Sequence, residues 1–157
     1  MNEDQTRGFT WMDETSTRGL VTLPSLKVND YETGEIYCQL LEKEYKLKTD
    51  FVNGVPTATI KIDALLVFED RYKISNLYRY ASVSAQSLDD ALKNQFTKEI
   101  EKEIKVAINS LVSSDCDAIG IKENLYRHHY KQYKSSKISD KKLENFAINY
   151  KVTVRFK

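Results

Sequence analysis

The stretch TATIKIDALLVF, residues 57–68, decides the fold class. Its apolar side chains recur at every second position, which is the period of a β-strand with one buried face. Asn53-Gly54, a favoured pair for a tight hairpin turn, stands just before it and follows a strand-like segment at 35–50. We therefore predict antiparallel strands that share a buried face. The inward residues are Ala58, Ile60, Ile62, Ala64, Leu66 and Phe68.

Beyond residue 87 the apolar period changes from two to mostly four. This spacing predicts one long amphipathic helix over 87–112, whose charged outer side is a solvated surface of mixed sign. A second helix is expected over 117–133, where Gly120 suggests close packing or a kink. Strand-like alternation returns at 148–156. The apolar stripe of the long helix is Leu88, Leu92, Phe96, Ile100, Ile104, Ile108 and Leu111.

The remaining segments have weaker patterns. Residues 19–23 are expected to form a short strand that ends at Pro24, and residues 30–34 a turn. Residues 69–86 are expected to be irregular, with a short strand at 78–83, and residues 134–142 to form a basic loop.

The order of elements predicts an α+β fold. We expect a mostly antiparallel sheet, with the long amphipathic helix and the second helix packed on one face and a closing C-terminal strand. Residues 1–18 are expected to be a polar tail with one aromatic anchor, or a lead-in from a preceding domain. Residues 19–157 are expected to form a single domain.

Composition indicates a globular chain with an uneven charge. Of 157 residues, 41% are hydrophobic and 30% charged, which excludes disordered and low-complexity classes. The net charge is +1, but residues 120–157 hold 10 Lys and Arg against 3 Asp and Glu. That segment is therefore +7 and residues 1–119 are −6. A basic third can bind phosphates or an anionic membrane surface, or can be a solvated face matched to the acidic part.

No membrane span, signal peptide or lipidation motif is evident. No apolar run approaches the roughly 18 residues that a span needs. The polar, acidic start lacks the basic and apolar regions of a signal peptide. We expect either a cytoplasmic protein or a piece of a longer one.

Residues with catalytic potential do not assemble into a known motif. The chain has no Gly-rich phosphate loop and no Gly-x-Ser-x-Gly elbow. His128 and His129 are adjacent on a predicted helix, so they point about 100° apart. A site built from Cys116 with one of these histidines is a further hypothesis, although the spacing matches zinc ligands poorly. We predict no enzyme, no catalytic residue, no metal and no cofactor.

The sharpest local feature is the aromatic and basic segment 126–134. Tyr126, Tyr130 and Tyr133 follow the i, i+4, i+7 spacing of one helical stripe. Tyrosines interleaved with Arg127, Lys131 and Lys134 can bind single-stranded nucleic acid by stacking and phosphate neutralisation. Alternatively, the rings lie on the core with their hydroxyls at its rim. The residues leave both interpretations open.

One stretch carries a family resemblance. SSDCDAIGIKENLYR, residues 113–127, follows the long charged helix, as a similar segment does in the Ger(x)C family. Residues 8–11 with 18–19, 44–48 and 152–156 also resemble that family in order and spacing. The chain thus resembles, over most of residues 8–157, the C-terminal domain of these C subunits of spore nutrient-germinant receptors. It departs from the family at Tyr133 and Phe146, where tryptophan is expected, and at Ile121.

The resemblance implies a non-enzymatic subunit that assembles with the membrane-embedded A and B subunits of the receptor. It implies a lipoprotein on the outer face of the spore inner membrane and argues against a nucleic-acid partner. Family members are more than twice as long and begin with a lipidated cysteine, a context that neither Cys38 nor Cys116 has. We therefore expect a soluble fragment, with the anchor outside it, or a shortened relative. The candidate partner-facing residues are Gly120, Leu125, Tyr126, Arg127, Tyr130 and Tyr133.

Overall fold

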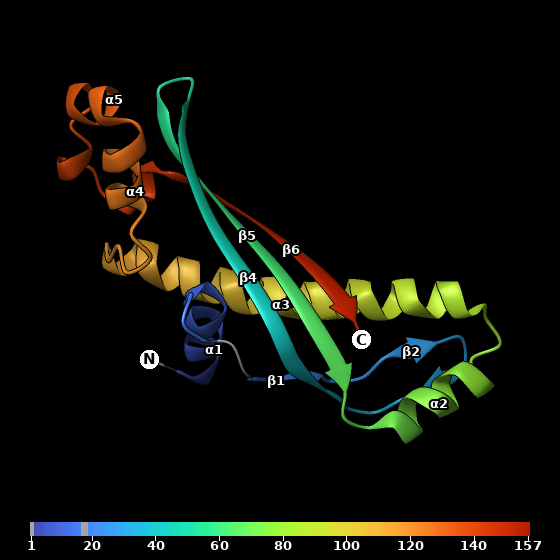
Figure 1. The fold of residues 1–157 in the computed structure, drawn as a ribbon. Coiled ribbons are helices and arrows are strands. Elements are labelled where there is room, and N and C mark those ends of the chain that lie inside the picture. The colour runs from blue at the N-terminus through green and yellow to red at the C-terminus, as the bar shows by residue number, and fades with distance from the viewer. Residues whose placement is uncertain (1, 17–18) are drawn as a thin grey trace. The chain divides into compact units, whose positions relative to one another are not determined.

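The computed structural model describes residues 2–16 and 19–157, which cluster into two compact units. Unit 1 comprises Met1–Glu14, Tyr45–Ile62 and Glu101–Lys151, and unit 2 comprises Thr15–Glu44, Asp63–Ile100 and Val152–Lys157. The longest strands and the longest helix contribute to both units (Figure 1). The expected division into a lead-in at 1–18 and one domain at 19–157 remains a prediction.

The main sheet has four strands in the order β1-β4-β5-β6, and β1 pairs antiparallel with β4 from Gly19↔Leu40 to Leu23↔Ile36. The predicted hairpin turn is confirmed, because Asn53 and Gly54 have φ angles of 51° and 78°, as a primed turn requires. The closing strand is also confirmed. The strands are β1 (Gly19–Leu23), β4 (Ile36–Val52), β5 (Val55–Phe68) and β6 (Ala147–Phe156), and a small second sheet pairs β2 (Lys27–Val28) with β3 (Tyr31–Glu32).

The last strand runs parallel to β5. The N–H of Lys157 donates to the carbonyl oxygen of Leu66 at 2.9 Å, and both strands point the same way in Figure 1. Parallel neighbours need a long crossover, which the helices between β5 and β6 provide. The predicted α+β fold with a mostly antiparallel sheet is confirmed.

Alternation along β5 places one face in the core, as predicted. Ala58, Ile60, Ala64 and Leu66 are fully buried, and Ile62 nearly so. In unit 2, Phe68 of β5 stacks on Phe156 of β6 with ring centroids 4.6 Å apart. Phe96 of the long helix meets Phe156 edge-on at 5.7 Å. These aromatic contacts join β5, β6 and the helix within that unit.

The long helix is confirmed as α3 (Ala85–Ser114), and five residues of its predicted stripe are fully buried. The expectation for 69–86 was wrong, because α2 (Arg71–Tyr80) occupies most of it. Asp70 caps α2 by accepting a hydrogen bond from the N–H of Lys73 at 3.1 Å. Leu77 is the buried anchor of α2. The remaining elements are α1 (Glu3–Met12), α4 (Ile121–His128), α5 (Tyr130–Ser135), η1 (Ile138–Asp140) and η2 (Leu143–Asn145).

Helix α1 replaces much of the expected polar tail. Asn2 and Gln5 form a reciprocal capping box with two hydrogen bonds of 2.9 Å. Gly8 packs so closely on α3 that a Cβ there would lie 2.1 Å from the carbonyl oxygen of Glu103. Trp11 is buried and donates from Nε1 to Oε2 of Glu103 at 2.7 Å. Helix α1 is therefore part of the packed structure of unit 1.

Candidate functional site

The start of α4 depends on two residues that precede it. Gly120 is the N-cap and has a φ of 74°, a left-handed conformation that favours glycine. Asp117 accepts hydrogen bonds from the N–H groups of Ile121 and Lys122 at 2.7 and 2.8 Å, so its carboxylate satisfies two free donors of the first turn. Ile121 and Leu125 are fully buried. Gly120 and Leu125 thus position the helix rather than face outward.

A break at His129 separates α4 from α5, where the sequence predicted one continuous helix. His129 has φ −135° and ψ 45°, and its Nε2 lies 2.9 Å from the carbonyl oxygen of Thr49 on β4. Because a carbonyl only accepts, this Nε2 carries the proton. The ring also meets Phe51 edge-on at 6.0 Å. The break therefore fixes the junction of the two helices to β4 within unit 1.

A second contact holds α4 to the same strand. The hydroxyl of Thr49 donates to Oδ1 of Asn124 at 2.7 Å, and Thr49 is buried. Sequence reasoning missed Thr49, Phe51 and Asn124 as positioning residues, since no local pattern links a strand to a helix 75 residues later.

The three tyrosines of segment 126–134 pack against one another. The ring of Tyr126 lies 5.2 Å from that of Tyr130 and 5.3 Å from that of Tyr133, both edge-to-face at 84°. Tyr126 is 48% exposed and Tyr130 50% exposed, so these two rings do not lie on the core. The ammonium of Lys134 lies over the ring of Tyr130, 5.7 Å from its centroid. We call Tyr126, Arg127, Tyr130, Lys131, Tyr133 and Lys134 the tyrosine–lysine surface.

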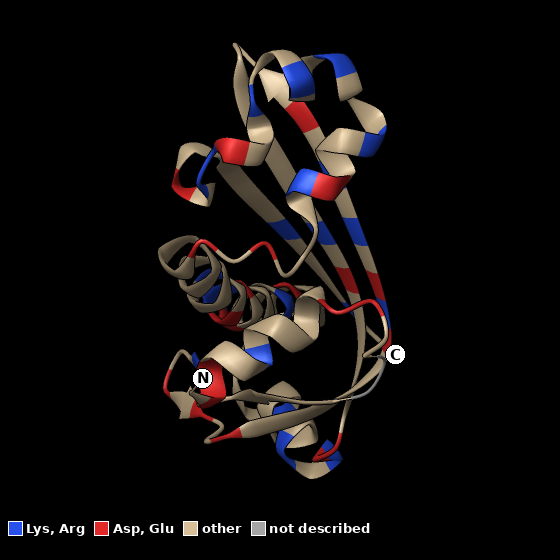
Figure 2. Cartoon of the chain, turned by 90° about the vertical axis from the view of Figure 1, so that its left-hand side faces the viewer, with Lys and Arg blue, Asp and Glu red and all other residues tan. Residues whose placement is uncertain are grey.

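The charge around this surface is strongly positive. Residues 121–142 hold seven Lys and Arg against Glu123 and Asp140, a net charge of +5. Figure 2 shows Lys and Arg along α4 and α5. Arg127 pairs with Glu123, but both side chains are more than 60% exposed, so the pair adds little stability. The basic residues of the segment are Lys122, Arg127, Lys131, Lys134, Lys137, Lys141 and Lys142.

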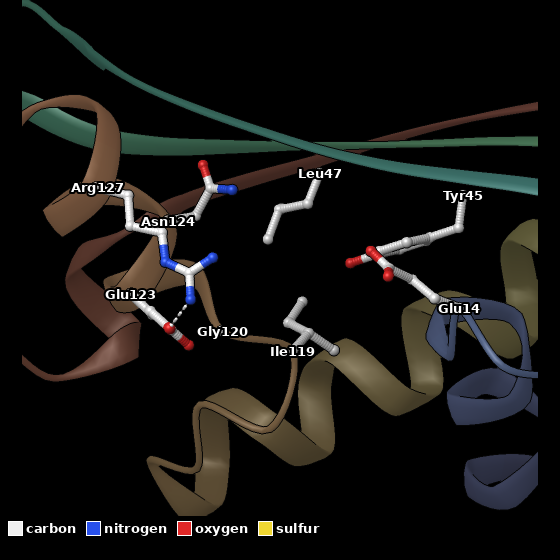
Figure 3. Close-up of a pocket in the computed structure, with 8 residues that line it drawn as sticks. All are labelled: Glu14, Tyr45, Leu47, Ile119, Gly120, Glu123, Asn124 and Arg127. Atoms are coloured by element: carbon white, nitrogen blue, oxygen red, sulfur yellow. Dashed lines mark hydrogen bonds and ion pairs between the residues drawn. The ribbon is translucent and has the colours of Figure 1, made fainter.

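An open pocket of about 230 Å³ lies beside α4 in unit 1 (Figure 3). In Figure 3, Arg127 and Glu123 stand at one end, and Tyr45 and Glu14 at the other. Burial, together with the smaller effects of the Glu14 and Asp117 charges, raises the pKa of Tyr45 to about 12. Among the described residues, the buried Tyr45 hydroxyl finds no hydrogen-bond partner. The phenol is therefore neutral at physiological pH. The lining is Glu14, Tyr45, Leu47, Ile119, Gly120, Glu123, Asn124 and Arg127.

The groups considered for catalysis lie in unlike surroundings. Cys116 is exposed and Cys38 is buried. Burial, followed by the charge of Glu69, raises the pKa of Cys38 to about 12, which keeps it a thiol. The Nε2 of His129 is engaged by Thr49. Within residues 2–16 and 19–157, no group of three or more His, Cys, Asp or Glu is placed to hold a metal ion.

Among the helices of residues 2–16 and 19–157, none combines the length and the apolar character needed to cross a membrane.

Comparison with known proteins gave two matches. The family model described as "Spore germination B3/ GerAC like, C-terminal" matches residues 1–157. The solved structure "Crystal Structure of the GerBC protein" is similar, with a TM-score of 0.75 and 16% sequence identity. The match covers 99% of this chain and 46% of that one, so the chain spans less than half the length of that protein. At this identity the likeness is one of fold. No curated protein sequence matches.

Proposed function

Because the chain belongs to the spore germination B3/GerAC-like, C-terminal family, we propose that it is a non-enzymatic interaction domain of a germinant-receptor C subunit. In this role it acts in nutrient-triggered spore germination. The observation that carries the proposal is the family match over the whole chain. The fold shared with the GerBC structure supports it.

The proposed contact region is the tyrosine–lysine surface. Tyrosine and arginine are enriched at the centres of protein interfaces, where they supply large contact area and hydrogen bonds. Tyr126, Arg127 and Tyr130 are exposed, and buried Leu125 and the left-handed turn at Gly120 hold them in place. The three exposed members of the candidate set, with half-buried Tyr133, are therefore the residues we assign to partner contact, and Gly120 and Leu125 are positioning residues.

We further propose that the partners are the membrane-embedded A and B subunits of the receptor. The full-length protein would then lie on the outer face of the spore inner membrane, tethered by a lipid anchor outside this chain. The domain's part in that assembly is recognition and requires no cofactor.

The test is germination of spores whose full-length C subunit lacks this domain. We expect the response to the nutrient to be lost, with germination by a receptor-independent trigger unchanged. Immunoblots for the truncated protein and for the A and B subunits provide the control for expression. Normal nutrient germination by spores that contain the truncated protein would contradict the proposal.

A further inference from the structure

The tyrosine–lysine surface has a chemistry that selects among partners. We propose that it binds an acidic protein segment, whose carboxylates meet Arg127, Lys131 and Lys134 and the tyrosine hydroxyls. This inference rests on the proposed interaction role and specifies the partner's chemistry.

Charge is the first argument. Residues 121–142 carry +5, whereas residues 1–119 carry −6, so the positive charge is concentrated on this segment rather than spread over the chain. Arg127 pairs with the exposed carboxylate of Glu123. Lys131 and Lys134 are exposed. A surface with this excess attracts an anionic partner and repels a cationic one.

The tyrosine cluster is the second argument. The ring of Tyr126 is in edge-to-face contact with both Tyr130 and Tyr133, so the three rings support one another before any partner arrives. Rings held in this way lose little conformational entropy on binding. Phenol hydroxyls donate hydrogen bonds and ring edges are electropositive, and both suit carboxylate oxygens.

The same contacts disfavour nucleic acid. Single strands bind by stacking bases on open aromatic faces. Here Tyr126 packs against two other rings, and the ammonium of Lys134 lies over Tyr130. Part of the ring surface that base stacking needs is thus already in contact within the tyrosine–lysine surface.

A lipid bilayer is also a poorer fit. Helices that bind at the membrane interface insert large apolar side chains below the headgroups. In segment 121–142 the aliphatic residues Ile121, Leu125 and Ile138 are fully buried, and the large exposed apolar side chains are Tyr126 and Tyr130. Binding to a bilayer would then rest on charge and on two tyrosines, without an aliphatic side chain of this segment to insert.

The test measures fluorescence anisotropy of a labelled 12-residue peptide in which glutamate alternates with serine, titrated with the purified chain. A peptide with glutamine in place of glutamate is the charge control. We expect Lys131→Glu/Lys134→Glu to weaken binding about tenfold or more, and Tyr126→Ser/Tyr130→Ser about fivefold. The matched control, Lys61→Glu/Lys151→Glu, reverses two exposed charges on strands of unit 1 and should weaken binding less than twofold.

Several results would overturn the proposal. One is no binding of the glutamate peptide at low salt, and another is equal weakening by the control pair, which would indicate net charge alone. Tighter, tyrosine-dependent binding to dT12 or to phosphatidylcholine vesicles with phosphatidylglycerol would assign the surface to nucleic acid or lipid. Self-association of the chain through this surface, seen by sedimentation, would assign it to a second copy. Such failures leave the germination test of the proposed function unaffected, so the two can be told apart.

Discussion

The contact of α1 with α3 and the tyrosine–lysine surface belong to the same unit but use helices in opposite ways. At the first, Gly8 and Trp11 bring the helix against α3 with no room for an added methyl group. At the second, Tyr126 and Tyr130 leave about half of their surface to solvent. The first pattern concentrates stability at the contact. The second adds little stability and presents groups that a partner can use. A polar-looking segment can therefore be structural, and an aromatic one can be a recognition surface.

The largest effect on stability is expected from a larger side chain at Gly8, where α1 contacts α3. A Cβ there would lie 2.1 Å from the carbonyl oxygen of Glu103 and 2.6 Å from Cβ of Ala107, so α1 must move away from α3. We expect Gly8→Val to lower the free energy of unfolding by about 3 kcal/mol, measured by urea denaturation. Gly19→Val is the matched control, since an added Cβ there meets nothing within 4 Å. Equal effects of the two substitutions would show that α1 is not closely packed.

A smaller change tests the polar part of the same contact. Trp11→Phe keeps an aromatic ring but removes the Nε1–H that donates to Glu103 at 2.7 Å. We expect a loss of about 2 kcal/mol in the free energy of unfolding, because a largely buried carboxylate loses its donor and the smaller ring leaves part of a buried site unfilled. Circular dichroism is the measurement, since Trp11 is the one tryptophan. An unchanged denaturation midpoint would mean that this hydrogen bond contributes no stability.

At the second region, Gly120 tests whether the site depends on a left-handed turn. Gly120→Ala should cost about 1 kcal/mol, because φ is 74° there and the nearest atom to an added Cβ is 4.0 Å away. The cost is thus conformational and not steric. Gly120→Asn should cost less, since asparagine tolerates this conformation. Thermal unfolding of both variants measures these costs. Equal losses of stability in the two variants would show that the left-handed conformation at residue 120 is not their cause.

Alkaline pH tests burial on the sheet side of the core. The pKa of Cys38 is about 12 in the folded protein against an ordinary 9.0, so the unfolded chain loses its thiol proton first as pH rises. The contribution of the Cys38 thiol to the free energy of unfolding is therefore fully present below pH 9 and falls above it, by about 1 kcal/mol at pH 10.

Thiol modification checks the same assignment of Cys38. In native protein at pH 8, iodoacetamide should modify exposed Cys116 and leave Cys38 unmodified until denaturant is added. Cys116→Ser is the control and should show no fast reaction. Rapid alkylation of Cys38 would contradict its burial.

The smallest effect on stability is expected at the tyrosine–lysine surface itself. Tyr126→Ser/Tyr130→Ser removes two half-exposed rings that contact each other, and the ring of Tyr126 also contacts Tyr133. We expect the free energy of unfolding to change by less than about 1 kcal/mol. A much larger loss in urea denaturation would reclassify these rings as part of the core.

The elements predicted correctly are mainly those in which a hydrophobic pattern continues over many residues. The alternation of Ala58 through Leu66, the turn at Asn53-Gly54 and the stripe of α3 each specify an element locally. Alternation in β6 predicts a strand but not its direction, because a parallel strand and an antiparallel edge strand can share the same pattern.

Helices α2 and α1 were not predicted, for two different reasons. In α2, the tyrosines at 72, 78 and 80 favour strands by propensity, while the capping residue Asp70 is a weak signal. In α1, few apolar residues mark a buried side. Gly8 allows the close packing on α3, and its sequence neighbours do not reveal this role. The readable signal was the Asn2–Gln5 capping box.

The candidate site was predictable only in part. Tyr126, Tyr130 and Tyr133 share a stripe by spacing alone, and the basic excess of the segment can be counted directly. The break at His129 and its bond to Thr49 depend on a strand distant in sequence. That contact is made by the N-cap residue of α5, the helix that carries Tyr130 and Tyr133.

The most direct test of the central claim is nutrient germination of spores whose full-length protein carries Tyr126→Ser/Tyr130→Ser. Tyr72→Ser/Tyr80→Ser, which removes two exposed rings of α2, is the matched control. With both proteins present at normal levels, we predict that the first pair slows the germination response to the nutrient and that the second does not. Normal germination by the first pair, or equal slowing by both, would contradict the assignment of partner recognition to the tyrosine–lysine surface.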